Sequence, residues 1–236
     1  NGDDTSDISR PTISCSANIN SDAGSYDINI IGGSALNYNI NSLKGTLLVN
    51  KKQLTVTADS KTKKYGEANP VFTIAYSGYA NGDNTASITE PTISCIATAT
   101  SNAGQYDISL SGGSAKNYSL NLINGKLQID KVELIVKAEN KSRKYGEPNP
   151  VFTAIYTGFV YKDDSAKITL PTFATVADQK SNAGTYDITL SGGVAENYTF
   201  SFTKGILEIT KATLTLTADD KTWNIYEPKP AFTLTY

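Results

Sequence analysis

The chain of 236 residues has no histidine and no methionine, and it has only two cysteines and one tryptophan. Without histidine it lacks the side chain that most often serves as a general base near neutral pH and as a metal ligand. A formal net charge of −2 provides no strongly basic surface of the kind that attracts nucleic acids or anionic membranes. We therefore expect no nucleic-acid binding and no enzyme that relies on histidine chemistry.

Long hydrophobic runs are also missing, since no stretch approaches the ~20 apolar residues that cross a bilayer as a helix. We therefore expect no insertion into a membrane. The chain is instead rich in asparagine, serine and threonine, and it has 14 tyrosines and 18 glycines. These residue types are typical of exposed β-structure and turns rather than of helices.

One phrase, SDAGSYDINIIGGSALNY at residues 21–38, returns in closely similar form at 101–118 and at 181–198. The spacing is 80 residues both times, and segments 54–133 and 134–213 share 40 identical positions without a gap. Units of this size can hold a core of their own, unlike solenoid repeats of roughly 20–45 residues. The predicted segments are a partial repeat at 1–53, complete repeats at 54–133 and 134–213, and a partial repeat at 214–236.

Short alternations of apolar and polar residues fill each complete repeat, and no segment has the period of a long helix. In the first of them they predict strands at 54–58, 72–76, 93–97, 106–110, 118–122 and 127–129. Asn124-Gly125 predicts a type I′ hairpin between the last two strands. This pattern indicates an all-β fold of immunoglobulin-like β-sandwich modules of about 80 residues. β-Grasp-like modules with one short helix stay an alternative, because Asp83 can cap a helical turn through Ile88.

Part of the recurring phrase, Asn102-x-Gly104-x-Tyr106, resembles the tyrosine corner of immunoglobulin-like sandwiches. In that motif a tyrosine near the start of a strand bonds its hydroxyl back to nearby backbone. Since a buried phenol needs a hydrogen-bond partner, we interpret the phrase as structural rather than chemical. The residues given this structural role are Gly24 and Tyr26, Gly104 and Tyr106, and Gly184 and Tyr186.

Two further motifs, KxxKYGExNPVFT and GxLxIxK, accompany the phrase in both complete repeats. Together the three motifs resemble the MBG domain of the YGX type, which occurs in tandem in bacterial surface adhesins. The resemblance covers the whole chain, as two full and two partial units. It implies a secreted, extracellular protein at the bacterial cell surface, without catalytic activity. Its most specific matches are Tyr65-Gly66-Glu67 with Asn69-Pro70, Tyr145-Gly146-Glu147 with Asn149-Pro150, and the three AGxYDI phrases.

The last partial repeat departs from this pattern. Trp223 to Tyr226 stand where Arg143 to Gly146 stand in the preceding repeat. Gly66 and Gly146 are expected to be structural glycines, whereas Tyr226 takes the place of such a glycine. We therefore predict that a positive φ is not required at Tyr226.

Candidate binding residues are few. Tyr79 and Tyr161 lie in a polar turn, and they and Trp223 are the aromatic residues expected to be exposed enough to stack on sugars. Acidic residues recur in the same turn, at Asp83 and at Asp163-Asp164. They suggest a Ca²⁺ site, but Ca²⁺ needs six to eight oxygen ligands and solvated turn residues explain them equally well. We predict no other cofactor or metal.

Catalytic and covalent chemistry are not expected. The aspartate of each YDI motif, such as Asp107, has no second carboxylate to form the pair that glycosidases need. Cys15 and Cys95 occupy equivalent positions of successive repeats, so they are expected to lie too far apart for a disulfide. Their apolar neighbours on the same strand face predict buried free thiols.

These observations predict a non-catalytic stalk or spacer that is built of tandem repeats and contacts its neighbouring repeats. One alternative is a module that binds glycan, mucin or a host surface protein weakly, with repetition supplying avidity. Another is a filament subunit, because residues 214–236 correspond to the part of a unit that residues 1–53 lack. That alternative predicts head-to-tail contacts between copies.

Overall fold

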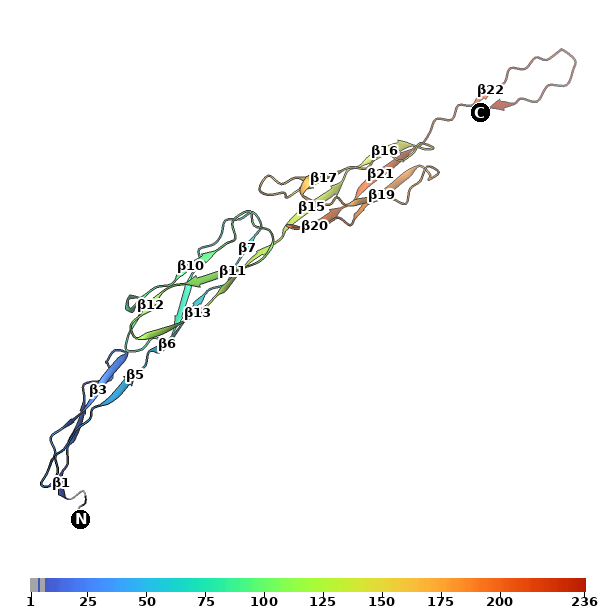
Figure 1. Cartoon of the computed structure of the whole chain (residues 1–236). Coiled ribbons are helices and arrows are strands. Elements are labelled where there is room, and N and C mark those ends of the chain that lie inside the picture. The colour runs from blue at the N-terminus through green and yellow to red at the C-terminus, as the bar shows by residue number, and fades with distance from the viewer. Residues whose placement is uncertain (1–3, 5–6) are drawn as a thin grey trace. The chain divides into compact units, whose positions relative to one another are not determined.

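The computed structural model describes residue 4 and residues 7–236, so residues 1–3 and 5–6 of the first partial repeat lie outside it (Figure 1). The chain divides into two compact units, residues 1–130 and 131–236. Each unit contains one complete repeat. The named helical elements are two 3-10 helices of three residues each, η2 (Thr85–Ser87) and η3 (Ser165–Lys167). All other elements are strands, and the prediction of an all-β chain is confirmed.

The first complete repeat consists of two main sheets, and its strands span residues 52–130. One sheet has the order β13-β6-β8 and the other β10-β11-β14-β7, while β9 and β12 form a separate pair. The strands are β6 (Lys52–Ala58), β7 (Lys61–Lys64), β8 (Ile74–Ser77), β9 (Ile88–Thr89), β10 (Thr92–Cys95), β11 (Gly104–Ser111), β12 (Ser114–Ala115), β13 (Tyr118–Ile123) and β14 (Gly125–Asp130).

The second complete repeat has the same arrangement, with the sheet orders β17-β15-β20 and β16-β21-β19-β18. Its strands are β15 (Val132–Ala138), β16 (Lys141–Lys144), β17 (Ala154–Thr157), β18 (Thr172–Ala174), β19 (Gly184–Ser191), β20 (Tyr198–Thr203) and β21 (Gly205–Thr210). Thr169 and Val194 form a single bridge where β9 and β12 pair in the first repeat.

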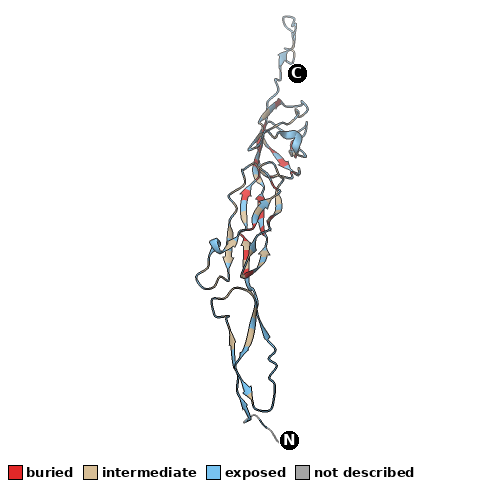
Figure 2. Ribbon diagram, turned by 60° about the vertical axis from the view of Figure 1, so that its left-hand side comes forward, coloured by how far each residue is buried: buried red, intermediate tan, exposed pale blue. Residues whose placement is uncertain are grey.

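The core of each complete repeat lies between its two sheets, where apolar residues of both are buried. Figure 2 colours the buried residues red along these strands. In the first repeat Leu54 and Val56 of β6 are fully buried, together with Ile108 of β11 and Leu127 of β14. β11 contacts both β6 and β13 across the core. Each such side chain contributes roughly 1.5–3 kcal/mol when it is fully removed from water.

Two parallel pairings join the beginning of a repeat to its end. β6 runs parallel to β13 in one sheet, and β7 runs parallel to β14 in the other. Both pairs have the same offset along the chain, from Lys52 opposite Tyr118 to Lys64 opposite Asp130. Residues 52–64 and 118–130 therefore form a parallel ribbon of one register, which is interrupted near Asp59 where it passes from one sheet to the other. We call this pair of segments the parallel ribbon.

The predicted hairpin at Asn124-Gly125 is wrong, because β13 and β14 belong to different sheets. The φ of Gly125 is not positive. A Cβ at this position would lie 2.5 Å from the carbonyl oxygen of Ala58, at the point where the ribbon changes sheets. The other Asn-Gly pair, Asn81-Gly82, has positive φ at both residues, and the Asp83 amide donates to Ala80 O at 2.9 Å, as in a type I′ turn.

Two further expectations needed correction. The predictions contained no strand at 61–64, whereas β7 occupies these residues. The helical turn is only η2, and its N-cap is Asn84 rather than Asp83. A 3-10 helix of three residues is too short to be the helix of a β-grasp module, so this alternative architecture is not what the chain forms.

The partial repeats consist of fewer strands. In the first, β2 (Thr12–Cys15), β3 (Gly24–Ile31) and β5 (Gly45–Val49) form one sheet, and β1 (Ile8–Ser9) pairs with β4 (Ser34–Ala35). In the last, β22 (Thr217–Ala218) pairs with β23 (Leu234–Thr235). Among the described residues neither partial repeat has an opposing sheet, and Figure 2 shows mostly exposed and half-buried residues along both.

Candidate functional site

The tyrosine of the recurring phrase forms the expected corner hydrogen bond in all three copies. The hydroxyl of Tyr26 donates to the carbonyl oxygen of Asp22 at 2.9 Å. Tyr106 donates to Asn102 O at 3.0 Å, and Tyr186 donates to Asn182 O at 3.0 Å. Each bond spans four residues and fixes the loop that leads into β3, β11 or β19.

We expect Tyr106→Phe to lower the free energy of unfolding of the first complete repeat by about 1 kcal/mol, since one hydrogen bond is lost without a cavity. Chemical denaturation followed by hydrogen exchange of peptides from this repeat would measure the change. Tyr145→Phe is the matched control, because Tyr145 is 48% exposed. An unchanged unfolding free energy for Tyr106→Phe would contradict the corner's contribution.

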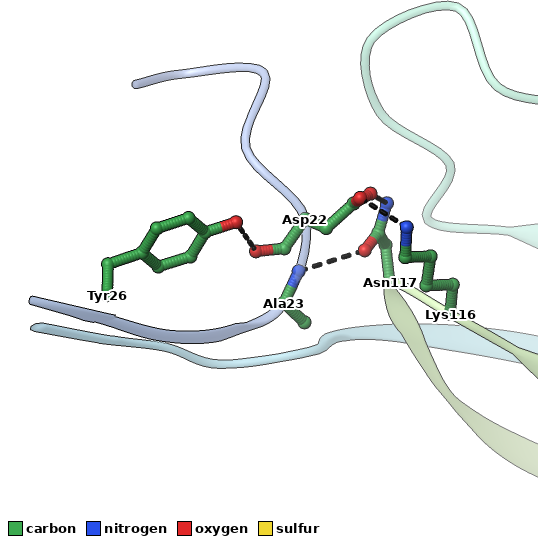
Figure 3. Close-up of polar contacts among 5 residues, drawn as sticks. All are labelled: Asp22, Ala23, Tyr26, Lys116 and Asn117. Carbon is green, nitrogen blue, oxygen red and sulfur yellow. Dashed lines mark hydrogen bonds and ion pairs between the residues drawn. The ribbon is translucent and has the colours of Figure 1, made fainter. Parts of the chain in front are cut away.

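The corner loop of the first partial repeat also binds the first complete repeat, as Figure 3 shows. The Asn117 side chain makes two hydrogen bonds to it: Nδ2 donates to Asp22 Oδ1 at 2.8 Å, and Oδ1 accepts from the Ala23 amide at 2.9 Å. Lys116 forms an ion pair with the same Asp22 carboxylate. The beginning of the phrase in one repeat therefore contacts the end of the phrase in the next.

The loop of the first complete repeat that contains Asn117 also holds the segment that links these two repeats. Lys51 Nζ donates to Ala115 O at 2.8 Å, and the Lys52 amide donates to Asn117 O at 2.9 Å. The loop thereby contacts both the corner and the linker. We call this set the junction clasp: Asp22, Ala23, Lys51, Lys52 and residues 115–117.

Charge reinforces the junction clasp. Hydrogen bonds from Lys116 and then from Asn117 lower the pKa of the Asp22 carboxyl below its ordinary value of 3.8. The pKa of Lys116 is raised by its hydrogen bond to Asp22. Because the pKa of Asp22 is lower in the folded chain than in the unfolded chain, the ionised carboxylate contributes to the free energy of unfolding. This contribution is fully present above the ordinary pKa and is lost as pH falls through the lowered value. Both groups are solvent-accessible, so salt is expected to weaken this ion pair.

A buried cation is the second recurring polar feature, and the predictions did not include it. Lys63 is only 5% exposed, and its Nζ donates to Glu67 O at 2.9 Å and to Thr98 O at 2.8 Å. Burial lowers its pKa. Arg143, at the equivalent position, is 6% exposed and donates Nε to Asn149 Oδ1 at 2.7 Å.

The two complete repeats differ in whether the buried cation donates a hydrogen bond to the side-chain oxygen of a neighbouring asparagine. Asn69 Nδ2 donates to Ala97 O at 2.6 Å, and Asn149 Nδ2 donates to Ala177 O at 2.7 Å. Asn149 Oδ1 accepts from Arg143, whereas the buried Oδ1 of Asn69 has no hydrogen-bond partner.

We therefore expect Lys63→Arg to stabilise the first complete repeat by about 1 kcal/mol, because the guanidinium Nε supplies the donor that Asn69 Oδ1 lacks. The reverse change, Arg143→Lys, should destabilise the second repeat by a similar amount. Hydrogen exchange under denaturant resolves both repeats in one chain. Equal stabilities for both variants and the unmodified chain would contradict the argument.

A family model for the MBG domain (YGX type) matches residues 1–48, 54–128 and 134–208. The chain belongs to the MBG domain (YGX type) family. The three matches follow the tandem arrangement predicted from the sequence and are consistent with a repeat segment of a surface protein. A comparison with curated proteins found no match. In the part of the chain that the structure describes, no helix is both long and apolar enough to span a bilayer.

Of the three aromatic candidates, Tyr79 is not the exposed residue that was expected. Its ring packs edge-on against Tyr118, with centroids 5.8 Å apart, and lies 5.9 Å from the ring of Tyr76. Its hydroxyl is buried, and burial raises its pKa. In the next MBG repeat Phe159 takes the same place between Tyr156 and Tyr198. This cluster packs the end of the sandwich and is no platform for a sugar.

Trp223 is 57% exposed, but it stands at the position of the buried cations Lys63 and Arg143. Its Nε1 donates to Glu227 O at 2.8 Å, the same bond that Lys63 makes to Glu67. This equivalence favours a structural role. The prediction for Tyr226 is wrong, since its φ is 73°, close to the 84° and 85° of Gly66 and Gly146.

Tyr161 is the candidate that is exposed on a complete repeat, at 52%. Tyr161 and Lys162 have φ values of 57° and 66°, and they occupy the turn that Asn81-Gly82 forms in the preceding repeat. Left-handed conformations cost such residues of order 1 kcal/mol each. Tyr79, Tyr161 and Trp223 thus lie in three different segments of the chain, 54–133, 134–213 and 214–236, at non-equivalent positions, and they form no recurring aromatic site.

The acidic candidates have local partners. Asp83 Oδ2 accepts from the Tyr118 hydroxyl at 2.6 Å, and Asp163 Oδ2 accepts from Tyr198 at 2.7 Å. Asp164 caps η3 by accepting from the Ala166 amide at 2.8 Å. A cavity of about 160 Å³ beside the junction clasp has Asp83 as its one lining carboxylate. Across the described residues no three His, Cys, Asp or Glu side chains gather as a metal site, and the Ca²⁺ hypothesis stays an unsupported prediction.

Cys15 and Cys95 are both free thiols. The alternation of strands β2 and β10 had predicted that both thiols are buried, but each residue is only half-buried. Both lie in the first unit, one on each side of the junction clasp.

Proposed function

We propose that the chain is a non-catalytic spacer segment of an extracellular protein at the bacterial cell surface. The observation that carries this proposal is the junction clasp, in which one loop of a repeat contacts both the corner and the linker of the repeat before it. A short linker held at both sides restricts the angle between consecutive repeats. Restricted angles are what a spacer needs in order to hold a distant part of a protein at a defined separation.

The composition and the polar groups agree with this function. The largest recurring polar features, the tyrosine corner and the buried cation, hold loops and strands of the same repeat together. Their hydrogen bonds run to backbone carbonyls and, in the case of Arg143, also to the Asn149 side chain, so these polar groups have partners within their own repeat. The partners that the spacer requires are the neighbouring repeats of its own array.

The test is a distance measurement across the junction with spin labels on the native Cys15 and Cys95. We expect one narrow distance distribution for the unmodified chain and a clearly broader one for the double variant Asp22→Ala, Asn117→Ala, because the corner then loses its side-chain contacts. Asp107→Ala is the matched control, since it removes an exposed ion pair with Lys126 inside the first complete repeat. A broad distribution in the unmodified chain, or none of the expected broadening, would refute the spacer.

Weak glycan or mucin binding is the second candidate function, and the exposed, strained Tyr161-Lys162 turn is what favours it. Strained conformations are retained where surrounding structure or function requires them. A glycan and mucin array with the full chain, with and without Ca²⁺, tests this candidate. Saturable binding that Tyr161→Ala removes would support it, whereas binding unaffected by that change, or no binding, would reject it.

A further inference from the structure

The first complete repeat contains two Asn-Gly pairs, Asn81-Gly82 and Asn124-Gly125, and their surroundings differ. Asn81 and Gly82 are both exposed, and their φ values are 52° and 79°. In the part of the chain that the structure describes, neither the Asn81 side chain nor the Gly82 amide takes part in a hydrogen bond. The side-chain amide of Asn81 and the backbone nitrogen that follows it are therefore both unengaged.

The turn that holds this pair is anchored at its two ends and not at its tip. The hydroxyl of Tyr118 accepts from the Ala80 amide at 3.0 Å and donates to Asp83 Oδ2 at 2.6 Å. In the second complete repeat the tip is Tyr161-Lys162, again with positive φ at both residues. The turn keeps its backbone conformation with different residues at its tip, so its shape does not depend on an Asn-Gly sequence.

The other pair is held in place by the fold. Asn124 Oδ1 accepts from the Leu110 amide at 3.0 Å. Gly125 is buried, and a Cβ built on it would lie 2.5 Å from Ala58 O. The backbone at Gly125 therefore has no space to rotate its nitrogen toward the Asn124 side chain.

We propose that Asn81 is a site of spontaneous deamidation, in which the Gly82 backbone nitrogen attacks Cγ of the Asn81 side chain. The N–Cγ bond forms and the Cγ–Nδ2 bond breaks, and ammonia leaves with the proton that the Gly82 amide gives up. The cyclic succinimide that results is opened by water at either of its carbonyls, which yields aspartate or isoaspartate. The net reaction is hydrolysis of a side-chain amide to a carboxylate, with water as the co-reactant. Glycine favours the attack because it has no Cβ beside the nucleophilic nitrogen.

This modification goes beyond the spacer function, because it changes the charge beside the junction clasp. Asn81 lines the cavity of about 160 Å³ next to the clasp, together with Asp83 and Lys52. After the reaction this cavity has two carboxylates instead of one, and isoaspartate also lengthens the backbone of the turn. Tyr161 has no side-chain amide, so the second complete repeat lacks the site.

Peptide mass mapping of the folded 236-residue chain during incubation at mildly alkaline pH tests the proposal, with fragment spectra to locate the modified residue. The peptide that contains Asn81 should gain about 1 Da and separate into an aspartate and an isoaspartate form. The peptide that contains Asn124 is the internal control and should keep its mass. In chain unfolded by denaturant both peptides should gain mass at similar rates, because the fold alone protects Asn124. Asn1-Gly2 lies outside the described residues and falls on a separate peptide.

Gly82→Lys tests the mechanism, because Lys162 occupies this position in the second complete repeat with a φ of 66°. The turn should be kept, and the mass gain at Asn81 should slow by roughly tenfold or more, since the added Cβ hinders the attacking nitrogen. Three results would each overturn the proposal: no mass gain at Asn81, equal rates at Asn81 and Asn124 in the folded chain, or an undiminished rate in Gly82→Lys.

Discussion

Gly125→Ala should destabilise the first complete repeat by about 3 kcal/mol, because the added Cβ has no space in the parallel ribbon. It would lie 2.5 Å from Ala58 O and 3.0 Å from Asp59 O. Both are backbone atoms, and β6 is held between β13 and β8, so neither atom can move aside cheaply. Hydrogen exchange of β6 and β13 amides should report the loss as faster exchange confined to this repeat.

Gly24→Ala is the control for the same chemical change, because nothing lies within 4 Å of its Cβ position. It should leave exchange in the first unit unchanged. Gly205→Ala repeats the test in the other complete repeat, where the Cβ would lie 2.7 Å from Ala138 O. Stabilities that are the same for Gly125→Ala and Gly24→Ala would show that the ribbon does not need a glycine at its crossing.

Arg143→Met should also cost the second complete repeat about 3 kcal/mol, although methionine keeps much of the apolar volume. The change removes the donor from Asn149 Oδ1 and from the Asp178 carbonyl, whose hydrogen bonds to Arg143 are both partly buried. Each buried acceptor that loses its partner costs roughly 1–3 kcal/mol. Thermal or denaturant unfolding, read by hydrogen exchange of β16 and β21, measures the effect.

Lys144→Met is the matched control for removing a positive charge, because Lys144 is the exposed neighbour of Arg143 on β16. It should change the unfolding free energy little. If Arg143→Met were no more destabilising than Lys144→Met, the buried cation would be dispensable and the repeat would be held by its apolar core alone.

Strands with an apolar core face were predictable, since their alternation follows from a sheet buried on one side. β6, β11, β13 and β14 are of this kind. β7 was missed because its sequence, KTKK, has no apolar residue, and its one inward side chain is Lys63. Burial of that lysine depends on carbonyls from Glu67 and Thr98, and no local pattern indicates such partners.

The tyrosine corner was predictable because its hydrogen bond spans only four residues. The junction clasp was not, since its partners Ala23 and Asn117 are 94 residues apart. The recurring phrase did contain a signal: both ends of it, DAG or NAG and then NY, stay fixed between copies while residues such as Leu36, Lys116 and Glu196 vary. The two ends of the phrase contact each other between successive copies, so the residues at both ends are expected to be the same in every copy.

The parallel ribbon also determines how a repeat responds when its two ends are pulled apart. Tension enters at Lys52, the first residue of one ribbon segment, and leaves at Asp130, the last residue of the other. Because the segments are parallel neighbours, such a load slides one along the other and strains all their hydrogen bonds together, whereas an antiparallel hairpin pulled from its open end peels one bond at a time. A repeat of this topology is therefore suited to bearing load along the chain.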